Sequence, residues 1–224
     1  MTHSLEPVTG PLSRDALRTP RAAAIAGIAF AVLLFTVLVL VRVAVPNDPA
    51  DAGAWLTDSG RRRAAILALN LIPFAGIAFL WFIGVVRDRI GAGEDRLFAT
   101  VFLGSGLLFI AMLFAGGAVA GGLILTGDGQ PSAGVWSFGR QVTHTIFNVY
   151  AMRMAAIFTI STTTIATRLG IAPRWLSVLG LSTGLILMFA VGVFAWVELL
   201  FPVWVLALSL HILVVSFRSP TAQA

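Results

Sequence analysis

The chain has 224 residues, of which 58% are hydrophobic and 11% are charged, whereas soluble domains are about half apolar and about a quarter charged. It has no cysteine, which excludes disulfides, zinc-thiolate sites, iron-sulfur ligation and a thiol nucleophile. The net charge of +5 comes from arginines that separate apolar stretches rather than forming one basic face. The composition therefore predicts a protein that contacts the lipid bilayer and does not bind nucleic acid.

The apolar stretches predict an all-α membrane protein, a bundle of six transmembrane helices. A helix needs about 20 apolar residues to cross a hydrocarbon core of about 30 Å. Segments of this kind occupy residues 22–43, 63–86, 97–125, 141–167, 175–196 and 201–217, approximately. We expect residues 1–21, which are polar and proline-rich, to form a disordered cytoplasmic tail, and residues 218–224 to form a short cytoplasmic tail. No loop is long enough for a soluble domain.

The number of spans depends on residues 175–217, one apolar block interrupted near Glu198 and Pro202. Proline is tolerated in the first turn of a helix because the N–H there has no intrahelical partner. We therefore divide the block into two helices. One long fifth helix followed by a shallow re-entrant segment is the alternative, and it gives five full spans.

The distribution of arginine predicts the orientation. Short cytoplasmic loops carry an excess of positive charge, and an inside N-terminus places nine arginines in inner segments and five in outer segments. The run Arg61-Arg62-Arg63 in the first outer loop opposes this orientation. We expect both termini in the cytoplasm and a multi-pass location in the bacterial inner membrane.

Small residues four positions apart predict helix contact faces, because helices in lipid associate through close van der Waals fit. Such residues lie on the first, third and fifth expected helices: Ala23, Gly27 and Ala31; Gly117 and Gly121; Gly180 and Gly184. They indicate a tight bundle. A homodimer or a membrane protein partner on the same faces is the alternative.

Polar residues inside a bilayer are costly, so each needs a partner or a function. Arg153 lies about twelve residues into the expected fourth helix, near mid-membrane, where an unpaired guanidinium costs at least about 2.5–3.5 kcal/mol. We expect it to point into the bundle or into water. The candidate intramembrane polar site comprises Arg153, Tyr150, Asn148, His144, Asn70, Glu198 and His211. It is interpreted either as an anion or lipid-headgroup site or as a structural polar cluster.

Motifs for catalysis and cofactors are missing from the sequence. It has no Walker loop and no His-Glu-x-x-His helix, and the Gly-x-Ser-x-Gly letters of residues 180–184 lie inside an apolar helix, where they predict packing. His144 and His211 differ in expected depth by about 10 Å, which does not suit two ligands of one haem iron. We expect no catalytic residue, no metal site and no cofactor.

Two local resemblances remain. Residues 84–91 have the spacing Gly-x-x-x-Asp-Arg-x-Gly, which resembles the loop between helices 2 and 3 of major facilitator transporters, although Ala92 and Gly93 replace its basic pair. The chain also has half that family's usual number of helices. Residues 70–89 and 94–112 resemble a group of uncharacterised bacterial multi-spanning integral membrane proteins, which implies a multi-span fold.

The sequence favours a non-enzymatic membrane component with a scaffolding or partner-binding role, which needs only the packing faces. The alternative is a small transporter or channel that uses the polar site around Arg153.

Overall fold

The computed structural model describes residues 20–45, 53–90, 96–125, 132–170, 172–191 and 196–218. The expected tails, residues 1–21 and 218–224, lie almost entirely outside these ranges. Within them the chain is helical, without a β-strand, which confirms the all-α fold class. The main helices are α1 (Pro20–Ala44), α2 (Ser59–Ile90), α3 (Arg96–Leu125), α4 (Ala133–His144), α5 (Met152–Arg168), α6 (Arg174–Phe189) and α7 (Leu200–Arg218). The short elements are η2 (Ala54–Thr57), the π-helix η3 (Thr145–Ala151) and η4 (Val197–Leu199).

Five helical segments are long and apolar enough to cross a membrane, namely Arg21–Ala44, Ser59–Arg87, Leu97–Leu125, Ala133–Arg168 and Val197–Phe217. The fourth is a single continuous helix, because η3 joins α4 to α5 without a break. The sixth helix, α6, has 16 residues and measures about 24 Å, which is shorter than a hydrocarbon core of about 30 Å. The chain is a multi-pass helical membrane protein in which one of six helices is short.

Several helix boundaries differ from the sequence prediction. The fourth helix was expected over residues 141–167, but it begins at Ala133, where the hydroxyl of Ser132 caps it by accepting a hydrogen bond from the backbone N–H of Val135. The fifth was expected over residues 175–196, but it ends at Phe189. Before α7 starts, Trp196 has a left-handed φ of 72°, which a continuous α-helix does not accommodate.

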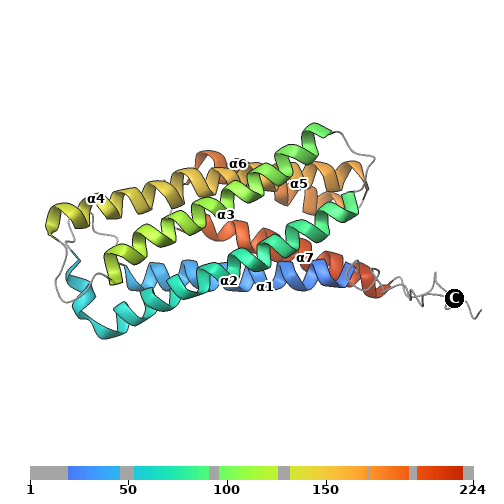
Figure 1. The fold of residues 1–224 in the computed structure, drawn as a ribbon. Helices are drawn as coiled ribbons and strands as arrows, with labels where there is room; N and C mark the ends of the chain where they lie inside the picture. Colours follow the sequence, from blue (N-terminus) through green and yellow to red (C-terminus); the bar gives the residue numbers. More distant parts are fainter. Residues whose placement is uncertain are drawn as a thin grey trace, which may run out of the picture.

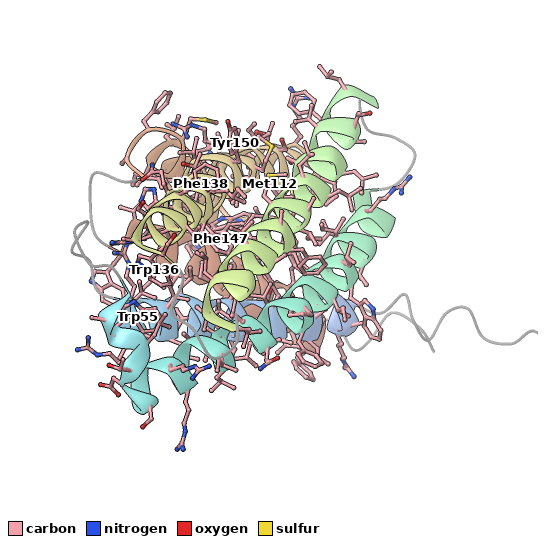
Figure 2. The ribbon with its side chains drawn as sticks, turned by 60° about the vertical axis from the view of Figure 1, so that its left-hand side comes forward. Trp55, Met112, Trp136, Phe138, Phe147 and Tyr150 are labelled. Atoms are coloured by element: carbon pink, nitrogen blue, oxygen red, sulfur yellow. The ribbon has the colours of Figure 1, made fainter. Side chains whose placement is uncertain are left out.

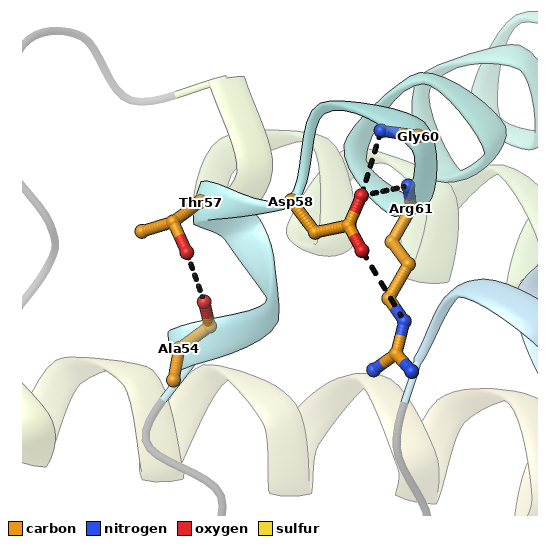
Figure 3. Close-up of polar contacts among 5 residues, drawn as sticks. All are labelled: Ala54, Thr57, Asp58, Gly60 and Arg61. Carbon is orange, nitrogen blue, oxygen red and sulfur yellow. Dashed lines mark hydrogen bonds and ion pairs between the residues drawn. The ribbon is translucent and has the colours of Figure 1, made fainter.

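The helix α2 also begins earlier than predicted, at Ser59 instead of residue 63. The reason is a second polar cap, shown in Figure 3: Asp58 Oδ1 accepts hydrogen bonds from the backbone N–H groups of Gly60 and Arg61, at 2.8 and 3.3 Å. These bonds satisfy donors that have no intrahelical partner in a first turn. In the preceding turn, Thr57 Oγ1 donates to the carbonyl oxygen of Ala54.

Six helical segments form a closed ring: α1, α2, α3, the continuous helix α4–η3–α5, α6 and α7. The helix α1 packs against α2 and α7, α3 packs against α2 and α5, and α6 packs against α5 and α7. In Figure 1, α1 begins and α7 ends at the same end of the bundle, which we call the base. The helices α1 and α3 end, and α2 and α4 begin, at the opposite end, where α4 projects past the point at which α6 ends (Figure 1).

The centre of the ring is filled by phenylalanine side chains that are at most 1% exposed. They are Phe30, Phe79, Phe82, Phe102, Phe109, Phe158 and Phe201, from α1, α2, α3, α5 and α7. The ring of Phe79 has five aromatic neighbours, with centroids between 4.3 and 6.1 Å away. Edge-to-face and tilted arrangements of this kind give dense packing through dispersion contacts.

Small residues on the predicted faces contact neighbouring helices of the same chain. Gly27 on α1 lies against Ser209 of α7, and Gly184 on α6 lies against Ile160 and the backbone of Ala156 on α5. Gly180 on α6 lies against both α5 and α7. These faces of α1 and α6 are occupied within the bundle, whereas Gly117 and Gly121 on α3 are half-buried.

Candidate functional site

The carboxylate of Glu198 pairs with Arg42, which lies near the end of the first expected helix, residues 22–43. Arg42 Nη2 lies 2.9 Å from Glu198 Oε1, and the two side chains are 29% and 11% exposed. The guanidinium of Arg42 also lies 5.8 Å from the ring centroid of Trp196. The pair connects the last turn of α1 to η4, which leads into α7. The signal in the sequence was a lone arginine near the end of one apolar helix and a lone acid at the start of another.

Arg153 does not enter the bundle. Its side chain is exposed on α5, and Nη1 donates a hydrogen bond of 3.0 Å to the carbonyl oxygen of Val149, on the same helix. Of the two placements expected from the sequence, the one inside the bundle does not match this exposed position, and contact with water stays a prediction.

The depth of Arg153 in a bilayer stays a prediction, which the length of its helix allows to be estimated from the base. At the base, the guanidinium of Arg168 lies 4.3 Å over the ring of Phe98. Arg153 is fifteen residues away along the helix, or about 22 Å, which leaves about 8 Å to the far boundary of a 30 Å core. Its bond to Val149 points away from the base, as in an arginine that extends toward the interface.

The other candidates of the polar site do not converge on Arg153. Asn70 is exposed on α2 and donates to the carbonyl oxygen of Ile66 on its own helix. The imidazole of His211 lies edge-on to Trp175, with ring centroids 6.3 Å apart. Tyr150 and His144 are exposed, and Asn148 is half-buried. In the part of the chain that the structure describes, no hydrogen bond or ion pair joins any two of the seven candidates.

A π-helix lies immediately before Arg153, and no sequence signal predicted it. In η3 the wider turn is marked by the bond from the backbone N–H of Met152 to the carbonyl oxygen of Phe147, five residues earlier. The ring of Phe147 packs against Gly116 of α3, where an added Cβ would lie 2.8 Å from it. Single π-turns within α-helices occur frequently at functional sites, which makes η3 a candidate functional feature.

Beyond η3 the helices form a second, smaller hydrophobic cluster. It contains Ala44, Trp55, Ala65, Ile124 and Trp136. We call η2, residues 59–66 of α2, residues 119–125 of α3 and the whole of α4 the cap. Figure 2 shows Trp55 and Trp136 beside each other there, and their rings are 6.1 Å apart at an angle of 62°. Gly53 has a φ of 90°, and a Cβ built on it would lie 3.1 Å from the Trp136 ring. This conformation suits glycine.

The helix that includes α4 is longer than a bilayer core is thick. The continuous helix from Ala133 to Arg168 has 36 residues and measures about 54 Å, against a core of about 30 Å. Arginines contact aromatic rings at the base, Arg21 over Phe217 and Arg168 over Phe98, as expected of side chains at an interface. The excess length therefore belongs to the cap, on which Phe138 of α4 is 73% exposed.

Metal binding has no support among the residues described, since no group of three or more His, Asp or Glu side chains lies close enough to hold an ion. Comparison with known proteins adds no family: no family model matches the sequence, and no curated protein and no solved structure is significantly similar to it. The resemblance to the major facilitator loop therefore rests on residues 84–91 alone. Residues 84–90 form the last turns of α2, and Gly91 lies outside the described ranges.

Proposed function

We propose that this protein is a non-enzymatic component of the bacterial inner membrane that binds a partner protein through its cap. The observation that carries the proposal is Phe138, which is 73% exposed on a helix whose length extends outside the hydrocarbon core. Exposed aromatic side chains in an aqueous region are a common feature of protein interfaces.

The interior of the bundle supports a scaffolding role. Seven buried phenylalanines fill its centre, and the polar residues that a transport path would use are exposed or lie apart, as Asn70 and Arg153 do. A rigid, densely packed bundle is suited to holding the cap in a fixed position.

Charge supports both the orientation and the kind of partner. The sequence count assigns nine arginines to inner segments and five to outer segments, so we propose a cytoplasmic base and an outer cap. Arg61, Arg62 and Arg63 are exposed on the first turn of α2, and their charge favours a partner surface that carries acidic residues.

The test is site-specific photo-crosslinking in native membranes, with the photoreactive residue at Phe138. Phe189 at the end of α6 provides the matched control, because it is also phenylalanine and is 79% exposed, but lies about 22 Å from the base, within the core. We expect one discrete protein adduct from position 138 and lipid adducts from position 189. Equal protein adducts at both positions, or none at 138, would contradict the proposal.

A small transporter or channel is the second candidate, and the π-helix beside Arg153 is the observation that favours it. It requires a water-filled cavity next to η3. Because the chain has no cysteine, Asn148→Cys introduces a single thiol there. Labelling of this thiol by a membrane-impermeant reagent favours transport, and protection from the reagent favours the partner-binding role.

A further inference from the structure

Two buried polar atoms that have no hydrogen-bond partner among the residues that the structure describes meet at one place in the bundle. They are Thr163 Oγ1 on α5 and Trp204 Nε1 on α7, in residues that are 3% and 1% exposed. Gly180 of α6 lies between them: a Cβ built on it would be 2.7 Å from Trp204 Nε1 and closer still to Thr163 Oγ1. The junction of three helices therefore contains an indole N–H and a hydroxyl side by side.

The hydroxyl of Thr163 differs from those of its neighbours on α5. Thr159, Thr162, Thr164 and Thr167 each donate to the carbonyl oxygen four residues earlier, at 2.7 or 2.8 Å. Thr163 has no such bond. Leaving a buried donor or acceptor unsatisfied costs about 1–3 kcal/mol, and no solvent inside a bilayer core relieves that cost. Two such atoms at one junction point to a shared partner.

We propose that one buried water molecule binds between Thr163 Oγ1 and Trp204 Nε1, beside Gly180, and links α5, α6 and α7. Since both atoms lie within 2.7 Å of the same point, they are less than twice 2.7 Å apart. Two hydrogen bonds of about 2.8–3.0 Å through one water span that distance. The indole N–H donates to the water oxygen, and the water donates to the threonine hydroxyl.

Further hydroxyl groups lie between this site and the base. Buried waters typically make about three hydrogen bonds to polar groups that are otherwise unsatisfied. One turn toward the base, Thr167 Oγ1 and Ser177 Oγ are 2.7 Å apart across α5 and α6. Hydroxyl groups thus continue from the exposed Thr167 toward Thr163, about 6 Å further along the helix, which provides a polar route by which water reaches the site.

A density map of the wild-type protein in lipid nanodiscs, at a resolution of about 2 Å, tests the proposal directly. We expect an isolated peak within about 2.7–3.1 Å of both Thr163 Oγ1 and Trp204 Nε1. A map without the peak overturns the proposal, whether the two side chains bond to each other directly or remain apart.

The second measurement is the indole proton resonance of Trp204, assigned by its loss in Trp204→Phe. Thr163→Val removes one partner of the water and is expected to shift this resonance. Thr162→Val is the matched control, because the Thr162 hydroxyl bonds only to the carbonyl of Phe158 on its own helix. A resonance that moves equally in both variants, or in neither, overturns the proposal.

Discussion

The guanidinium of Arg42 at the end of α1 lies 2.9 Å from the carboxylate of Glu198 in η4, just before α7. This ion pair closes the ring between the first and last helices at the end opposite the base. At the base the same two helices meet again through Arg21 and Phe217. The 21 residues from Arg21 to Arg42 correspond to about 31 Å, which matches the thickness of a hydrocarbon core.

Arg42→Ala is expected to lower the thermal stability of the detergent-solubilised protein more than Glu198→Ala. The carboxylate is the more buried partner, at 11% exposure against 29%, and a buried charge that loses its partner is strongly destabilising. Because the pair is partly exposed, we expect a loss of about 2 kcal/mol for Arg42→Ala.

The control for this ion pair is Arg61→Ala. Arg61 and Asp58 are 3.8 Å apart and more than half exposed, so their pair contributes less than about 1 kcal/mol. A greater loss in Glu198→Ala than in Arg42→Ala would contradict the burial argument.

Phe79→Ala is expected to destabilise the bundle by about 3 kcal/mol. Five aromatic rings surround Phe79, and they lose their contacts with it when a cavity replaces the ring. Phe74→Ala, at an exposed position on the same helix, is expected to change the unfolding temperature little. Similar losses in both variants would mean that the aromatic cluster has no special role.

Gly184→Ala is expected to weaken the contact between α5 and α6. An added Cβ there would press on Ile160 and come within 3.2 Å of the backbone oxygen of Ala156, and overpacking of this kind costs about 1–3 kcal/mol. Gly104→Ala on α3 is the control, because its Cβ would meet nothing within 4 Å. Thermal unfolding followed by tryptophan fluorescence compares the two variants. A loss of stability in Gly104→Ala but not in Gly184→Ala would contradict this packing of α5 against α6.

Arg153→Met is expected to leave the stability unchanged or raise it slightly. The guanidinium bonds only to the carbonyl of Val149 on its own helix, and a charged side chain is costly near the hydrocarbon core. The same unfolding measurement checks this. A fall as large as that of Arg42→Ala would show that Arg153 is part of a structural polar cluster, the role that its exposed position argues against.

Hydropathy alone located several helices well. The first was expected over residues 22–43 and spans Pro20–Ala44, and the third was expected over residues 97–125 and spans Arg96–Leu125. Both are apolar runs whose ends carry charge, as at Arg21 and Arg96. The fourth helix also includes residues 133–140, which precede the apolar stretch expected over residues 141–167, begin at the N-cap hydrogen bond of Ser132 and pack against α3. A hydropathy window does not register such contacts.

The sequence by itself determined the membrane class, the all-α fold and the helical spans, because the cost of placing polar groups in lipid acts on each segment independently. The tertiary structure decided the partners of the polar residues. It pairs Glu198 with Arg42 and leaves Arg153 exposed, because these outcomes depend on the rotation and relative depth of helices that are far apart in the chain. The cap also depends on tertiary structure, because it forms where η2 and parts of α2, α3 and α4 extend together beyond α6 and α7.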